Sequence, residues 1–274
     1  MTSSLRPDIG LIIVGDEILS GKRADKHLPK LVELLTERGL QLGWAEYVGD
    51  QPGRITETLR RAFASGDIVF SCGGIGATPD DHTRQCAAAA LGVPLVLHPQ
   101  ARDFVIERMK DVARENGTTF DPDREDNRHR LNMAVFPTGA EIIPNPYNKI
   151  AGFAVRSGKG GVFFVPGFPV MAWPMIEWVL DTRFRHLHVA PSTQERSVIV
   201  FGAMEAALTP LMEAIEREFP GIKVFSLPSV DHPDWGRHIE LGVKGEPALL
   251  AAAYGRLREG LEQSGAKLGP ELVR

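Results

Sequence analysis

The residues best suited to chemistry lie in one short stretch, Ser71–Arg84, where a glycine-rich loop precedes Thr78, Asp80 and Asp81. Glycines leave the backbone N–H groups uncrowded, so such a loop can approach a phosphate closely. Two adjacent carboxylates would repel a bare phosphate, and a divalent cation between them removes that conflict. The stretch therefore predicts a metal-assisted phosphate site. The residues expected to hold the phosphate are Gly73, Gly74, Ile75, Gly76 and Thr78.

The same residues also fit the start of a helix. Thr78 is a suitable N-cap, and Pro79 would then occupy the first helical position, where its missing N–H has no cost. Thr78 and Asp81 also have the spacing of a capping box. Capping alone requires neither the glycines nor two acids, so we favour a ligand site at a helix start.

The elements around this stretch indicate a parallel sheet. Residues 9–14 form a continuous apolar run, as expected of a strand buried on both faces. Residues 40–48 and 67–70 read as further strands, and helical patterns lie between and after them. This alternation predicts a doubly wound, mostly parallel α/β sheet in three layers, followed by a small α+β module.

Acidic residues follow each of these three strands. Gly15, Asp16 and Glu17 follow the first, Asp50 follows the second, and the glycine-rich loop follows the third. Asp50 could also cap the next helix. Ligands of such sheets bind outside the carboxyl ends of the strands, so we expect one cleft lined by all three clusters.

A second loop of this kind is expected further along the chain. Residues 152–165 read as a hairpin, and the turn that follows contains Pro166 and Gly167, which we assign to the same ligand site. Beyond it the pattern restarts, so we predict two domains, 1–185 and 190–274. The second reads as β-α-β-β-α without an acidic cluster, which we interpret as a structural or oligomerising appendage of a homo-oligomer.

Composition narrows the classes of partner. The net charge of −4 gives no case for a nucleic-acid-binding surface across the whole chain, and no apolar run approaches a membrane span. The chain has two cysteines, Cys72 and Cys86, which form no zinc pattern, and its first residues do not resemble a signal peptide. We therefore expect a cytoplasmic protein with a small-molecule partner and neither a membrane nor a nucleic-acid partner.

The stretch Gly73–Thr83 resembles the glycine loop of the molybdopterin-binding family, which includes MogA, MoaB and the gephyrin G domain. The resemblance is greatest to the N-terminal domain of CinA, and it extends to the N-terminal domain of eukaryotic FAD synthase. It covers about residues 8–180. The further stretches that carry it are residues 15–21, 48–50, 130–134 and 165–169.

The resemblance implies a magnesium-assisted site for a phosphate or pyrophosphate. Asp50 and Asp81 align with the family's metal-binding and catalytic aspartates, and Asp80 matches the acidic doublet of CinA-type members. The family's acid after the second loop is replaced here by Met171. The second module resembles the KH-type domain of CinA, but it lacks a clear RNA-clamping loop. We expect a stand-alone form without the CinA amidohydrolase domain.

Two functions follow as hypotheses. The first is a nucleotide pyrophosphatase for substrates such as ADP-ribose or FAD, dependent on Mg²⁺, Mn²⁺ or Co²⁺. Asp50 and Asp81 would be catalytic, and both would bind the metal together with Asp80. The alternative is a non-catalytic protein that binds molybdopterin or another pterin, or a factor in molybdenum-cofactor biosynthesis.

Overall fold

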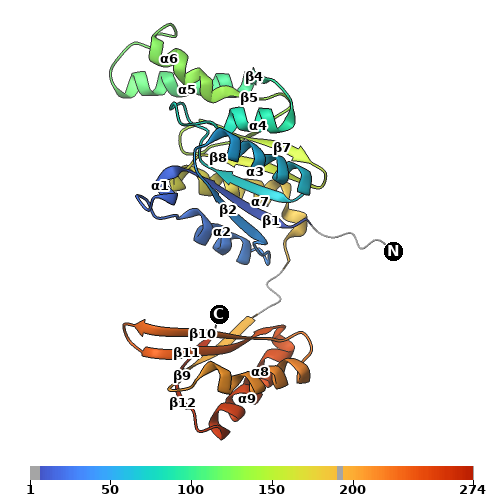
Figure 1. Ribbon diagram of the computed structural model, residues 1–274. Helices are drawn as coiled ribbons and strands as arrows, with labels where there is room; N and C mark the ends of the chain where they lie inside the picture. Colours follow the sequence, from blue (N-terminus) through green and yellow to red (C-terminus); the bar gives the residue numbers. More distant parts are fainter. Residues whose placement is uncertain (1–6, 190–193, 274) are drawn as a thin grey trace. The chain divides into compact units, whose positions relative to one another are not determined.

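The computed structural model describes residues 7–189 and 194–273 (Figure 1). The chain divides into two compact units, one ending at His188 and the other beginning at Val189. The N-terminal residues 1–6, and residues 190–193, where the second predicted domain begins, lie outside the described residues. Among the described residues, no helix is both long and apolar enough to cross a membrane.

A six-stranded sheet forms the centre of the first unit, in the order β2–β1–β3–β8–β7–β6 (Figure 1). The first four strands in that order are parallel, and the last two are antiparallel to their neighbours. The strands are β1 (Ile9–Val14), β2 (Trp44–Val48), β3 (Ile68–Cys72), β6 (Glu141–Ile143), β7 (Gly152–Ser157) and β8 (Gly160–Val165). The predicted parallel sheet and hairpin are confirmed, although β2 begins four residues later than expected.

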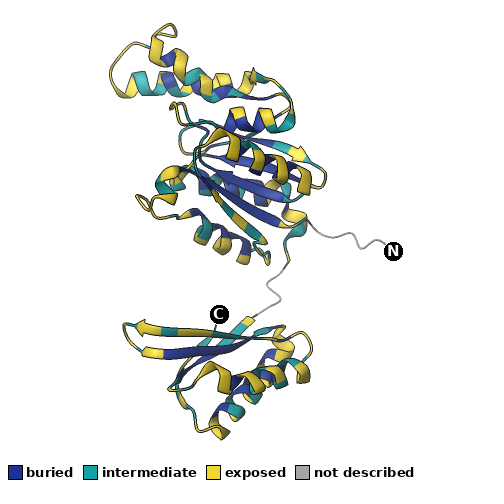
Figure 2. Ribbon diagram, viewed as in Figure 1, coloured by how far each residue is buried: buried dark blue, intermediate teal, exposed yellow. Residues whose placement is uncertain are grey.

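Helices cover both faces of this sheet. On one face, α2 (His27–Thr36) and α7 (Pro169–Arg183) pack against side chains such as Phe70. On the other face, α3 (Pro52–Ser65) and α4 (Thr83–Leu91) pack against Val69 and its neighbours. Because side chains alternate along a strand, β3, which is buried throughout, contributes to both cores. Figure 2 shows buried strands of the sheet between the helices. The predicted three-layer α/β fold is therefore confirmed.

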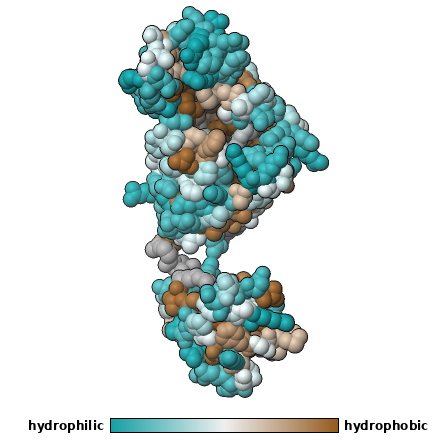
Figure 3. All heavy atoms as spheres, turned by 90° about the vertical axis from the view of Figure 1, so that its left-hand side faces the viewer, coloured by the Kyte–Doolittle hydropathy of each residue, from teal (hydrophilic) through white to brown (hydrophobic). Residues whose placement is uncertain are grey.

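An extension from α4 forms an arm on the first unit. It contains β4 (Leu95–Leu97), α5 (Pro99–Glu115), α6 (Glu125–Arg130), the 3₁₀ helix η1 (Leu131–Ala134) and β5 (Val135–Pro137). Strands β4 and β5 pair antiparallel, which returns the chain to the sheet. The visible surface of the arm is mainly hydrophilic (Figure 3). The short helices α1 (Asp16–Leu19) and η2 (Arg185–Leu187) complete this unit.

The second unit is a four-stranded antiparallel sheet in the order β10–β11–β9–β12. Its strands are β9 (Gln194–Phe201), β10 (Lys223–His232), β11 (Gly236–Gly245) and β12 (Lys267–Val273), and its helices are α8 (Glu205–Glu218) and α9 (Pro247–Gln263). The expected order β-α-β-β-α lacked the last strand. We missed β12 because Gly269 and Pro270 are unfavourable in strands, and its pairing with β9 is bulged there. The other edge strand, β10, also contains a proline, Pro228.

Candidate functional site

A cleft of about 560 Å³ opens at the carboxyl ends of β1, β3 and β8. Because these strands are neighbours and parallel, the loops that follow them meet at one edge of the sheet. Every residue assigned to the site from the sequence lines this cleft except Asp16. The lining residues among those predicted are Gly15, Glu17, Asp50, Gly73, Gly74, Ile75, Gly76, Thr78, Asp80, Asp81, Pro166 and Gly167.

The glycines of the loop are required by close contacts within the protein. A Cβ at Gly73 would lie 2.4 Å from the carbonyl oxygen of Val14, and one at Gly74 would lie 2.2 Å from Thr83 Oγ1. Both glycines also have positive φ, 105° and 68°. A Cβ at Gly76 would lie 2.5 Å from Asp81 Oδ2. The loop backbone is therefore packed directly onto the end of β1 and the start of α4.

The N–H groups of this loop are available to a ligand. The loop is fixed at its ends, where Gly73 N donates to Val165 O at 3.0 Å and Thr83 N donates to Gly74 O at 2.9 Å. In the part of the chain that the structure describes, the amides of residues 74–77 have no hydrogen-bond partner. Consecutive unpaired amides in a fixed loop form a concave site for an anion.

Asp81 holds the loop closed beyond these amides. Its Oδ2 accepts hydrogen bonds from Thr78 Oγ1 at 2.5 Å and from Thr78 N at 2.8 Å. This turn keeps the chain out of helical geometry, and α4 begins only at Thr83, with His82 as its N-cap. The predicted capping role of Thr78 and the placement of Pro79 at the first helical position are therefore wrong.

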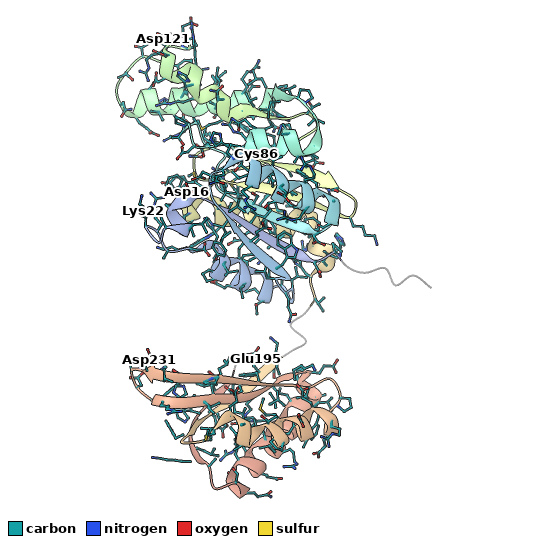
Figure 4. The ribbon with its side chains drawn as sticks, in the orientation of Figure 1. Asp16, Lys22, Cys86, Asp121, Glu195 and Asp231 are labelled. Carbon is teal, nitrogen blue, oxygen red and sulfur yellow. The ribbon has the colours of Figure 1, made fainter. Side chains whose placement is uncertain are left out.

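Asp50 joins the ends of two strands. Its Oδ2 accepts from Asp16 N at 2.9 Å, and Asp16 Oδ1 accepts from Asp50 N at 3.2 Å. The N-cap of α3 is Gln51, so the predicted capping role of Asp50 is also wrong. Asp16 lies at the start of α1 (Figure 4), and its side chain lines neighbouring hollows instead of the main cleft.

The acids around Asp50 make its charge unfavourable. Partial burial raises the pKa of Asp50, and the nearby carboxylates of Asp16, Glu17 and Asp80 raise it further, against the lowering effect of the Asp16 amide. Like charges this close favour protonation or a bound cation. The cleft therefore combines free amide donors with a carboxylate group that a cation would stabilise.

Comparisons with known proteins identify the family. The sequence profile described as "Probable molybdopterin binding domain" matches residues 10–186. The chain belongs to this molybdopterin-binding-domain family. The CinA-like protein of Anaeromyxobacter dehalogenans is 35% identical over 173 residues, which cover 63% of this chain and 40% of that protein. The chain thus spans less than half the length of such curated relatives.

Two further relatives show how far the similarity extends. A protein of Pyrobaculum calidifontis is 31% identical over 236 residues, covering 85% of this chain and 86% of that protein. A crystal structure of CinA from Thermoplasma acidophilum, described as having unknown function, matches with a TM-score of 0.52 and 26% identity. That match covers 64% of this chain and 96% of the other.

The carboxylates of the cleft can be compared with the ligand set that a divalent metal requires. No group of three or more His, Cys, Asp or Glu side chains is placed to hold a metal ion, within the residues that the structure describes. Asp50, Asp80 and Asp81 all line the cleft, and Thr78 hydrogen-bonds to both Asp81 and Asp80. Mg²⁺ commonly binds one or two carboxylates and completes its shell with substrate phosphates and water. Asp50 and Asp80 fit that partial arrangement.

Arg84 was not assigned to the site from the sequence, although it is the last residue of the stretch that contains the predicted loop. Its side chain is buried, with only 4% of the residue exposed. One guanidinium nitrogen, Nη2, donates to Gly76 O at 2.6 Å, and Nε has no partner. Burial lowers the pKa of Arg84, opposed by the charge of Asp81. Among the described residues no carboxylate forms an ion pair with it, so a buried positive charge, with Asp81 as the acid that acts on it, lies beside the loop.

Other lining residues carried no clear sequence signal. Met171, at the position of the family's acid, lines the cleft and contacts Asn148, whose Nδ2 lies 3.2 Å from the Met171 sulfur. The next residue, Lys149, has a positive φ of 67°. Its Nζ bonds to Glu107 at 2.6 Å and to Asp111 at 2.8 Å, which ties this loop to α5. The remaining lining residues that we did not predict are Val14, Arg23, Ala77, Met133, Ile150, Ala151 and Phe168.

Proposed function

We propose that the cleft binds a phosphorylated pterin or nucleotide, with a phosphate held by the loop amides of residues 74–77. The observation that carries this proposal is the run of unpaired amides in a rigid loop. Charge-assisted hydrogen bonds from such amides are among the stronger ones in proteins. The membership in a molybdopterin-binding-domain family supports a pterin as the organic part of the ligand.

The buried guanidinium of Arg84, which forms no ion pair among the described residues, supports the same proposal. A buried charge without an ion pair is costly, so a structure that retains one gains when an opposite charge arrives. Arg84 bonds to the carbonyl of Gly76, within the stretch that supplies the free amides. Bound phosphate would therefore benefit from the amides directly and from the positive potential beside them.

Titration calorimetry tests the proposal. Inorganic pyrophosphate, ADP-ribose and a phosphorylated pterin are titrated into the full chain, each with and without Mg²⁺. We expect saturable binding of pyrophosphate and of at least one of the two larger ligands. The exposed Arg54, which lies on α3 away from the glycine loop, provides a matched control, because Arg54→Gln should leave binding unchanged. Failure of all three compounds to bind would overturn the proposal.

The acids of the cleft support a second function, the hydrolysis of a nucleotide pyrophosphate. A divalent metal held by Asp50 and Asp80 would neutralise charge on the pyrophosphate. Burial and the neighbouring acids raise the pKa of Asp50, and a cation bound there would stabilise its ionised form. Asp81 would contribute by holding the loop through Thr78.

Turnover assays separate hydrolysis from binding. The purified chain is incubated with ADP-ribose and FAD in the presence of Mg²⁺, Mn²⁺ or Co²⁺. If hydrolysis occurs, Asp50→Asn should lower kcat strongly, with less effect on pyrophosphate binding. Binding without turnover on any substrate would reject hydrolysis and leave the binding function intact.

A further inference from the structure

A side pocket of about 300 Å³ opens next to the glycine-loop cleft. Five residues line both: Val14, Glu17, Arg23, Gly167 and Phe168. The two hollows are therefore neighbours that share part of their walls. If a phosphate lies on the loop amides, as the proposed function states, the rest of its ligand can extend into this side pocket.

The side pocket has an apolar floor and one exposed aromatic wall. Ile13, Ile18 and Cys72 contribute to the floor. Phe168 stands at the boundary between the pocket and the cleft and is 56% exposed. Exposure of an aromatic ring to water is unfavourable, so a ligand that covers the ring at the mouth of a pocket gains binding free energy.

Phe168 is held on a rigid support. It is the N-cap of α7, and its carbonyl accepts from Met171 N at 3.0 Å and Ala172 N at 2.9 Å. The preceding residue is held too, because His27 Nε2 lies 3.0 Å from Gly167 O. A carbonyl can only accept, so this nitrogen carries the proton and donates it. Gly167 also packs against the glycine loop, where its Cβ would lie 3.5 Å from Gly73 Cα.

Polar groups at the rim complete the pocket. His27 is 5% exposed, and its Nδ1 has no hydrogen-bond partner among the described residues, which leaves an acceptor beside the pocket wall. Arg23 and Lys26 supply positive charge at the mouth. Arg23 is only loosely paired, since its Nη1 lies 4.0 Å from Glu17 Oε1. A guanidinium in this state can stack on a planar ring.

We propose that the side pocket binds the planar nitrogen heterocycle of the ligand, a nucleobase or a pterin ring, with Phe168 as its stacking surface. An apolar floor, an exposed aromatic ring and few polar groups suit a flat heterocycle better than a sugar, which needs many hydrogen bonds. The inference rests on the proposed function, because it assumes a phosphate on the glycine loop. It assigns the specificity for the organic part of the ligand to residues outside that loop.

The test compares probes with and without a ring. Wild-type protein and Phe168→Ala are titrated with inorganic pyrophosphate, ADP and a phosphorylated pterin. For the wild type we expect at least one ring-bearing probe to bind about tenfold or more tighter than pyrophosphate. Phe168→Ala should lose most of this difference and retain the affinity for pyrophosphate. Whichever of ADP and the pterin shows the larger loss identifies the preferred ring.

Matched variants separate stacking from a general surface effect. Phe168→Trp should retain the ring-dependent affinity, because it preserves an aromatic face. Tyr147→Ala removes another exposed aromatic, 62% exposed and outside both hollows, and should change nothing. The backbone contacts of Phe168 do not involve its side chain, so thermal melts of all variants should agree with wild type.

The outcomes distinguish this inference from the proposed function. If pyrophosphate does not bind to wild type, the phosphate site is wrong. If pyrophosphate binds but neither ring-bearing probe binds more tightly, the ring pocket is overturned while the phosphate site stands. The same conclusion follows if Phe168→Ala binds both ring-bearing probes as tightly as wild type.

Discussion

Arg84 is a buried arginine whose Nε has no hydrogen-bond partner among the described residues. It places a cation in the protein interior without a carboxylate to pair it, among the described residues. We predict that Arg84→Gln lowers the affinity for pyrophosphate about tenfold, because the positive potential beside the loop amides is lost. Its thermal stability should change little, since removing a buried unpaired charge offsets the lost bond to Gly76.

The conservative replacement Arg84→Lys provides the control for charge. It keeps the positive charge but not the planar guanidinium, so an intermediate affinity is expected. Calorimetry and thermal melts on the same samples measure both quantities. An unchanged affinity in Arg84→Gln would mean that this charge serves only the fold.

Asp50 allows a prediction about pH. Its pKa is raised in the folded protein by burial and by neighbouring acids, so ionisation of Asp50 opposes folding. A raised carboxylate pKa means that stability falls as the pH rises through the ordinary range of aspartate toward the folded pKa. We therefore predict that Asp50→Asn is more stable than wild type at pH 7, and that the difference disappears in acid, where wild-type Asp50 is protonated.

Chemical denaturation at a series of pH values measures this difference. Asp103→Asn is a suitable control, because Asp103 is exposed on the arm and pairs only with its neighbour Arg102. A lower stability of Asp50→Asn at neutral pH would show that the bond from Asp16 N outweighs the repulsion.

At the scale of elements, the glycine loop and α4 depend on each other. The space that a Cβ at Gly74 would need is occupied by Thr83 Oγ1, which itself donates to Gly73 O at 3.1 Å. We predict that Gly74→Ala destabilises the protein by about 1–3 kcal/mol, because it combines this clash with a positive φ. This loss of stability comes from contacts within the protein and is separate from any loss of ligand binding.

Double-mutant analysis checks the cause. Thr83→Ala removes the obstructing oxygen, so Gly74→Ala should cost less in that background than in wild type. Gly53→Ala is the matched control, since Gly53 lies in α3 with no atoms near its missing Cβ. Additive costs at Gly74 and Thr83 would contradict the predicted clash.

The same elements show what the sequence could and could not predict. Continuous apolar strands, strand-end acids and glycines at 73, 74 and 76 were sufficient for the sheet and the cleft edge. The start of α4 was not predictable, because Thr78 and Asp81 have the same spacing in a capping box and in the turn that forms. The burial of Arg84 and the position of Phe168 depend on packing between distant segments, which no local pattern encodes.

At the scale of the whole molecule, each unit has a core of its own. The second unit buries apolar side chains of β9, β11, α8 and α9 in a separate cluster. We predict that residues 189–274, expressed alone, unfold cooperatively, and that the first unit alone retains pyrophosphate binding. Circular dichroism melts and calorimetry measure these properties. A non-cooperative melt of the isolated second unit would show that it requires the first.

The self-association of the full chain into a homo-oligomer stays a prediction. Sedimentation equilibrium of the full chain and of the two separate units would measure it. If the second unit is the oligomerising part, the full chain should associate and the first unit alone should not.

Two prolines in the edge strands of the second unit affect whether separate copies can pair edge to edge. Pro228 and Pro270 lie in β10 and β12, the two outer strands of its sheet, and a proline has no backbone N–H to donate. Prolines in edge strands therefore disfavour pairing between strands of separate copies. A concentrated sample of this unit should resist fibril growth, and replacing both prolines with threonine should make thioflavin-positive aggregates appear sooner.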